Sequence, residues 1–320
     1  MPFMAAPKDP WNAFEPARRL VEAGRYEEAA RRVRPWLNAA DRELALEAVD
    51  VEATRLRELG RHREAVRLLS KGTRRPGERP TVFDLVRGAS LAALGDLDGA
   101  AAAYASPPPE LSHSETSDAW VLRQDARAFA WSRALLADAL VVGAEARREA
   151  PDTVRLHALA DSIETIGAQS YFARDWRLHH HVRGLIAARA GRWREAVAEF
   201  EQARWTRTGG WTRTVAELAR AQLALGRPDR ALTALADARS MVLNAGGRYL
   251  TRTEIALWTA RAFAAAGQSD SSQAYAAMVR RAWRDADPIV RRQLALLPPE
   301  APVNRTAQND SGSRSSASVR

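Results

Sequence analysis

Three consecutive histidines, His179, His180 and His181, are the residues whose type most directly suggests chemistry, because imidazole nitrogens are common metal ligands. They fall in an apolar-periodic stretch that predicts a helix, in which successive side chains point about 100° apart. Three neighbouring side chains on one helix therefore fan over roughly 200° and cannot converge on one ion. We predict no metal site here.

The helical pattern gives each histidine a different direction. His180 lies on the stripe expected to pack against a partner helix, whereas His181 shares a stripe with Arg177 that would face a concave groove. His179 follows Asp175 by four residues. That pair could bind a metal with help from elsewhere in the chain, but a solvated ion pair is favoured at this spacing.

Other motifs that would indicate catalysis are missing from the sequence. It has no phosphate-binding loop, dinucleotide fingerprint, H-E-x-x-H pair or G-x-S-x-G elbow. It also has no cysteine, which excludes disulfides, thiol nucleophiles and thiolate metal sites. We therefore expect a protein that is not an enzyme, with no catalytic, cofactor-binding or metal-binding residues.

The elements that must position these side chains repeat along the chain. Each repeat has a glycine, a small residue seven positions before it, an alanine five after it and a large apolar residue nine after it. The glycines are Gly24, Gly60, Gly95, Gly191 and Gly226. A weaker sixth match is at Gly267, which has Ser272 where alanine is expected.

This pattern predicts helical hairpins that stack on one another. A glycine can adopt the left-handed conformation that ends one helix and lets the next begin. Small residues on both sides of the turn allow the two helices to approach closely, and the large residue fills the groove towards the next hairpin. One hairpin cannot bury its own apolar face, so several must stack.

The spacing, together with Tyr26 and Trp193 two residues after their glycines, resembles the tetratricopeptide repeat family. The resemblance implies an all-α fold, namely a right-handed superhelical array (α-solenoid) of about seven antiparallel helix hairpins. It also implies a non-catalytic scaffold or adaptor that binds a protein or peptide partner in a concave groove formed by the first helices of the hairpins.

Breaks in the period predict the organisation of the chain. We expect an N-terminal tail (1–10), three hairpins (11–105), a proline-rich insertion (106–118), four further hairpins with a capping helix at the open end (119–297), and a disordered tail (298–320). Residues 119–167 are predicted to form one oversized hairpin, with Asp152 as the N-cap of its second helix.

The charge of the chain is strongly positive, with a formal net charge of +9 and a pI of about 10.7. Lys8 and Lys71 are its two lysines, so arginine supplies nearly all of the positive charge. This bias is typical of a GC-rich bacterial genome, so we favour solvated arginines over nucleic-acid binding. Oligomeric state does not follow from the sequence.

The predicted groove is basic in its C-terminal half and would favour an acidic peptide segment or a C-terminal carboxylate. We expect it to be lined by Arg177, His181, Arg189, Arg213 and Arg220. In the N-terminal half, the corresponding positions hold Arg18, Asp50, Thr54 and Arg57.

The duplicated segment Trp205–Thr214 has two interpretations. In the favoured one, Trp205 and Trp211 fill a seam between hairpins. In the other, Arg207 and Arg213 beside Trp211 form an exposed platform for an anionic or aromatic ligand.

A second hypothesis for function is a sensor or assembly module of a bacterial transcriptional regulator or kinase system, with its effector domain on another chain. The sequence has neither a signal peptide at its start nor an apolar run long enough to cross a membrane. We expect a bacterial, cytoplasmic protein that does not contact membranes.

Overall fold

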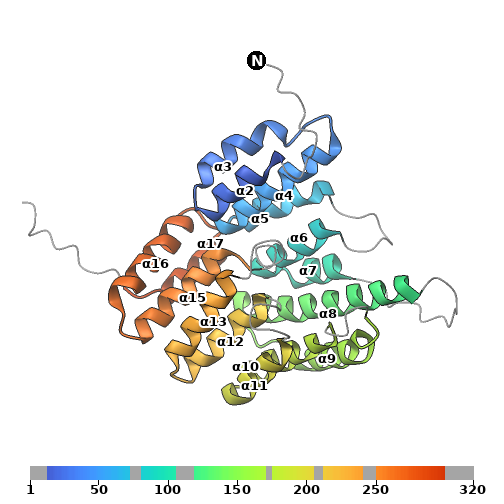
Figure 1. Ribbon diagram of the computed structural model, residues 1–320, viewed down its shortest axis with the longest axis vertical. Coiled ribbons are helices and arrows are strands. Elements are labelled where there is room, and N and C mark those ends of the chain that lie inside the picture. Colours follow the sequence, from blue (N-terminus) through green and yellow to red (C-terminus); the bar gives the residue numbers. More distant parts are fainter. Residues whose placement is uncertain are drawn as a thin grey trace, which may run out of the picture.

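The computed structural model describes residues 13–72, 81–105, 119–170, 175–204, 212–240 and 250–299, and this part of the chain contains helices and no β-strand (Figure 1). Seven antiparallel helix pairs follow one another along it, which confirms the predicted all-α array of about seven hairpins. The pairs are α2 (Glu15–Glu22) with α3 (Tyr26–Val33), α4 (Arg42–Glu58) with α5 (His62–Leu69), α6 (Val82–Ala93) with α7 (Leu97–Tyr104), α8 (Ala119–Arg147) with α9 (Thr153–Gly167), α10 (Leu178–Arg189) with α11 (Trp193–Ala203), α12 (Thr212–Ala224) with α13 (Pro228–Ser240), and α15 (Arg252–Ala265) with α16 (Ser269–Ala282).

Short 3-10 turns and a final short helix complete the described elements. They are η1 (Arg34–Trp36), η2 (Ser70–Gly72), η3 (Asp175–Arg177), α17 (Pro288–Arg291) and η4 (Arg292–Leu296). The predicted N-terminal tail, the proline-rich insertion and residues 300–320 of the predicted C-terminal tail lie outside the described residues, as do residues 205–211 of the duplicated segment.

Each predicted turn glycine ends its helix in the left-handed region. The backbone φ angles of the five lie between 68° at Gly60 and 79° at Gly95, and Gly267, the weaker match, has a φ of 73°. At Gly191 the amide donates to the Ala188 carbonyl, and the next amide donates to the Ala187 carbonyl. This pair of bonds satisfies carbonyls that the end of the helix leaves open, so the turns form as the sequence predicts.

The N-termini of several helices are fixed by side-chain caps. Asp152 accepts a hydrogen bond from the Arg155 amide at 2.9 Å, as predicted for the start of α9. Thr81 and Thr251 each form a reciprocal capping box with the acidic residue three positions later. Such caps satisfy amides that have no partner inside the helix.

Within a hairpin, the small residue before the turn lies under the large residue after it. A Cβ atom added to Gly184 would come within 2.5 Å of the Phe200 ring, and one added to Gly88 would come within 2.5 Å of the Tyr104 ring. The atoms nearest to such a Cβ at Gly184 belong to Phe200, across the hairpin. The glycines therefore make room for aromatic rings that are almost fully buried.

The array bends until its two ends meet (Figure 1). The amide of Asp287, just before α17, donates to the Gly60 carbonyl at 3.0 Å, and the Asp287 carboxylate accepts from the Arg63 amide at 3.0 Å. Glu58 at the end of α4 caps α15, since its carboxylate accepts from the Arg252 and Thr253 amides at 2.8 and 2.9 Å. We call this set of bonds the closing contact.

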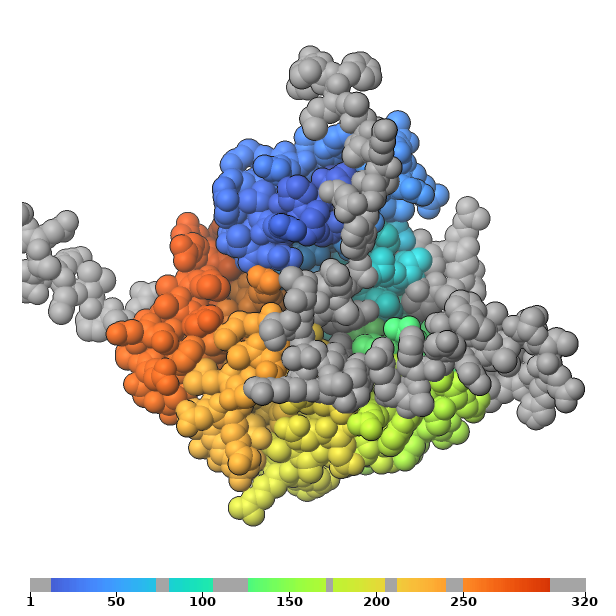
Figure 2. Space-filling model, viewed as in Figure 1, coloured from blue at the N-terminus to red at the C-terminus, as the bar shows by residue number. Residues whose placement is uncertain are grey.

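The last short helix belongs to the closing contact. Val290 of α17, with Trp283 and Ala286 before it, packs against Gly60 at the turn of the second pair. We expected a helix at 288–297 that caps an open end; instead it covers the turn between α4 and α5. Figure 2 shows the surface of the first two pairs adjoining that of the last pair on the face in view.

Candidate binding pocket on the inner face

The five predicted groove residues do not form one basic surface. His181 and Arg213 are buried, with 0% and 8% of their surface exposed. The guanidinium of Arg213 lies 2.9 Å from the Asp138 carboxylate of α8 and 3.6 Å from that of Glu254 on α15. We expected these side chains to reach solvent or a ligand; instead, carboxylates from helices distant in sequence neutralise and cover Arg213.

His181 belongs to the same buried group. Its Nδ1 lies 3.1 Å from the Thr214 hydroxyl and its Nε2 lies 3.8 Å from the Asp138 carboxylate. Burial, followed by the charge of Arg213, lowers the pKa of His181 to about 3, so the ring is neutral at pH 7. Burial raises the pKa of Asp138 to about 7, although Arg213 acts in the opposite direction. We call Asp138, His181, Arg213 and Glu254 the inner ion network.

The three consecutive histidines contact three different partners. Nδ1 of His179 faces the Trp176 carbonyl, Nδ1 of His180 lies 2.8 Å from the Glu199 carboxylate on the partner helix α11, and His181 joins the inner ion network. His180 therefore contacts its partner helix, whereas His181 is buried instead of lining an open groove. In the described part of the chain, no three histidine, aspartate or glutamate side chains are placed to hold a metal ion together.

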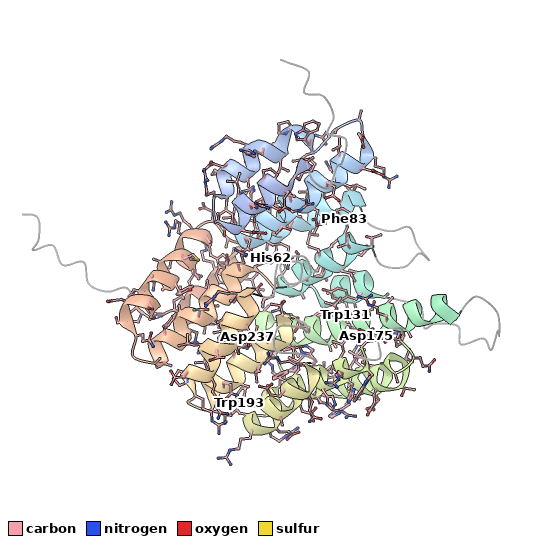
Figure 3. The ribbon with its side chains drawn as sticks, viewed as in Figure 1. His62, Phe83, Trp131, Asp175, Trp193 and Asp237 are labelled. Carbon is pink, nitrogen blue, oxygen red and sulfur yellow. The ribbon has the colours of Figure 1, made fainter. Side chains whose placement is uncertain are left out.

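Arg177 lies apart from the other predicted groove residues. It belongs to η3, and its guanidinium donates to the Arg204 carbonyl at 3.1 Å. The neighbouring Asp175 is buried and accepts a hydrogen bond from the Trp131 indole at 3.1 Å, so η3 is attached to α8 (Figure 3). Arg177 thus links η3 to the end of α11.

The two arginines predicted at groove positions in the N-terminal half are also paired or buried. Arg18 forms an ion pair with Glu47 and lies 3.9 Å from Asp50, and Arg57 is 2% exposed. Arg213, which the platform hypothesis placed beside Trp211, points into the inner ion network instead. The seam expected at Trp205 and Trp211 lies outside the described residues.

Arg189 and Arg220 form a second group that remains partly open to solvent. Both pair with Glu145 near the end of α8, and Arg220 also lies 2.7 Å from the Glu217 carboxylate. Their side chains keep 22% and 21% of their surface exposed. These two are the predicted groove residues that the structure brings together at a surface.

A third arginine completes this site. Arg220 and Arg261 lie over the Trp258 ring, with guanidinium carbons 4.6 and 4.5 Å from its centroid. Among the described residues, Arg261 has no carboxylate partner. Burial, followed by the charge of Arg220, lowers the pKa of Arg261, which shows that its positive charge is poorly compensated.

These side chains surround a cavity of about 390 Å³ between the C-terminal ends of α10, α12 and α15. Trp193, at the start of α11, forms part of its wall. In Figure 3 Trp193 lies far from His62, so this cavity is remote from the second pair. We call this cavity the Arg–Trp pocket. Three half-buried guanidinium groups and two indole rings make it suited to an anionic group, because partly desolvated cations bind anions more strongly than exposed ones.

The sequence analysis missed Arg261 and Trp258, although a signal for Arg261 exists. Arg220 and Arg261 each lie six residues before their turn glycine, Gly226 and Gly267, so the repeat register places them at equivalent positions on successive first helices. That equivalence is hard to detect from the sequence because the repeat match at Gly267 is weak, with Ser272 where alanine is expected.

No protein-family model and no curated protein matches this chain. Solved structures of tetratricopeptide repeat proteins are similar to it at low sequence identity. A tetratricopeptide repeat protein from Parabacteroides merdae is 13% identical with a TM-score of 0.39, covering 89% of this chain and 97% of that one. The tetratricopeptide repeat domain of P58(IPK) is 14% identical with a TM-score of 0.29, covering 90% and 96%. BtubC (BKLC) from P. vanneervenii is 15% identical with a TM-score of 0.32, covering 98% of each chain.

The fold itself is TPR-like, as the chain's own helix pairs, glycine turns and close small-to-large contacts establish. Among the described helices, none combines the length and apolar character that crossing a bilayer requires.

Proposed function

We propose that this chain is a non-catalytic scaffold that binds an acidic segment of a partner protein at the Arg–Trp pocket. The observation that supports the proposal most strongly is Arg261, a half-buried cation that lies over Trp258 without a carboxylate partner among the described residues. A carboxylate from a partner would relieve the cost of burying that charge, because charge-assisted hydrogen bonds to arginine are among the stronger polar contacts.

Other features of the pocket favour a peptide side chain over a larger polyanion. Glu145 and Glu217 already hold Arg189 and Arg220, so the carboxylates that surround the pocket offset most of its charge. One or two incoming carboxylates would match what remains, whereas a run of phosphates would meet Glu145 and Glu217 directly. The indole rings add apolar contact for the stem of a glutamate or aspartate.

Binding of a fluorescently labelled peptide with two glutamates, Ser-Ser-Glu-Glu-Ser-Ser, followed by fluorescence polarisation, tests the proposal. We expect Arg261→Gln to weaken binding about tenfold, because one charge-assisted contact contributes roughly 1.5–3 kcal/mol. Arg261 is the better position to change because Arg189 and Arg220 also hold Glu145 in place.

The matched control is Arg230→Gln, which removes an exposed arginine from α13 outside the pocket. It should bind the peptide as the native chain does. If the native chain fails to bind this peptide, or if both variants bind it with the same affinity, the Arg–Trp pocket is not an acidic-peptide site.

A further inference from the structure

A second cavity, of about 480 Å³, lies where the two ends of the array meet. The turn after α2 forms one wall. The end of α13, the start of α15 and the C-terminal half of α16 form the others. The cavity brings these elements together although more than two hundred residues separate α2 from α15 in the sequence. We call this cavity the junction pocket.

The floor of the junction pocket is apolar. It is lined by Leu250 just before α15, by Ile255 and Ala256 of α15, and by Met278 of α16. Met278 is 48% exposed, which is unusual for a large apolar side chain in the described part of this chain. An exposed methionine beside a concave apolar surface is typical of a place where an apolar group binds.

Three arginines lie at the rim of the same cavity. The Arg252 guanidinium donates to the Glu22 carbonyl at 2.8 Å, which holds it across the junction. Arg239 lies over the Tyr275 ring at 5.7 Å, and Arg281 has neither an ion pair nor a hydrogen bond among the described residues. None of the three guanidinium groups therefore forms an ion pair with a carboxylate of the described residues.

Negative charge at the junction pocket is scarce. Glu22 is the single carboxylate among the described residues that line it, and burial raises the pKa of that carboxylate. The cavity thus combines an apolar floor with an excess of guanidinium groups at its edge. Its volume lies within the range of cavities that hold small organic ligands.

We propose that the junction pocket binds a carboxylate that carries an apolar body. The apolar part lies on Ile255 and Met278, and the carboxylate pairs with Arg281 and Arg239. Such a ligand could be a free organic acid or the C-terminal residue of a peptide, because both present the same chemistry. The site shares no residue with the Arg–Trp pocket and is independent of the function proposed for it.

Isothermal titration calorimetry of the full chain with two pairs of probes tests this proposal. One pair is decanoate and decanol, and the other is acetyl-Leu-Leu-Phe as its free acid and as its amide. We expect at least one acid to bind and its neutral counterpart to bind at least about tenfold more weakly. The acid that binds identifies the source, either a free organic acid or a peptide C-terminus.

Two variants locate the binding. Arg281→Gln should weaken binding of the same acid about tenfold. Arg284→Gln, which removes an exposed arginine that does not line the junction pocket, should leave it unchanged. The proposal is overturned if neither acid binds, if the neutral probes bind as well as the acids, or if both variants lose the same affinity.

Discussion

The size of the residue seven positions before each turn glycine is matched to the residue nine positions after it. Where the later residue is aromatic, as in Tyr104 and Phe200, the earlier one is glycine, and the ring occupies the space that a Cβ would take. Where the later residue is smaller, the earlier one is alanine, as in the pairs Ala17 with Val33, Ala53 with Leu69, Ala219 with Leu235 and Ala260 with Ala276. Each hairpin thus holds its helices close in one of two ways.

Gly184→Ala should destabilise the protein, although alanine favours helix more than glycine does. Its Cβ would lie 2.5 Å from the Phe200 ring, and overpacking of this kind costs roughly 1–3 kcal/mol. Adding Phe200→Leu should recover part of that loss, because Ala219 with Leu235 already shows that alanine and leucine fit at these positions. Urea unfolding of both single variants and the double variant measures these free-energy losses. Strictly additive losses would show that the sizes of residues 184 and 200 are not matched.

His181 should make the protein less stable in mild acid. Its pKa is about 6.5 unfolded and about 3 folded, so the stability it contributes is present above pH 6.5 and is lost as the pH falls towards 3. From pH 7 to pH 5 this loss is about 2 kcal/mol. Asp138 acts in the opposite direction. Because its pKa is raised to about 7 in the folded state, the stability of the protein that depends on Asp138 falls as the pH rises.

Urea unfolding of the native chain and His181→Asn at pH 7 and pH 5 isolates that contribution. The variant should be less stable at pH 7 because the buried contact with Thr214 is altered, but the gap should narrow by about 2 kcal/mol at pH 5. A gap that stays constant with pH would mean that His181 is not buried in the neutral form.

At the scale of elements, the turns were the most predictable feature. The five turn glycines were identified because no other residue adopts a positive φ at so little cost. The turn after α8 gave no such signal, since Arg148 occupies the left-handed position with a φ of 62°. That hairpin was nevertheless predicted, because Pro151 breaks the helical pattern and Asp152 caps the next helix.

Two turn glycines that share one backbone conformation should respond differently to alanine. Gly226 has a φ of 69° and open space around it, so Gly226→Ala should cost only the backbone strain, about 1–2 kcal/mol. Gly60 has a φ of 68°, but a Cβ there would lie 2.7 Å from the Ala286 Cβ. Gly60→Ala should therefore cost roughly 1–3 kcal/mol more. Equal melting temperatures for the two variants would contradict the closing contact.

At the scale of the whole molecule, closure is what the sequence could not predict. Repeat spacing describes contacts between neighbouring hairpins, whereas Glu58 and Asp287 act on helices that are distant in sequence. The same limit applies to the groove. Asp138 pairs with Arg213, and Glu145 pairs with Arg189 and Arg220, but the sequence does not identify these partners because α8 does not follow the repeat register.

Closure also determines where a ligand can bind. In an open array the first helices would present a long concave surface. Here the inner ion network fills part of that surface, and space remains in the Arg–Trp pocket and in the junction pocket. The junction pocket therefore depends on how completely the first and last pairs meet, because residues of both pairs line it.

Chemical cross-linking tests the closed array most directly, since the chain has no cysteine of its own. Arg61 and Asp285 line one cavity between the first two pairs and the last pair, so Arg61→Cys with Asp285→Cys should be joined within one chain by a short bismaleimide. The control pair, Arg61→Cys with Val154→Cys, uses an exposed residue of α9, far from α5 in Figure 1, and should not be joined. High intramolecular yield for the first pair alone is the predicted result, and no intramolecular product from it would contradict the closed array.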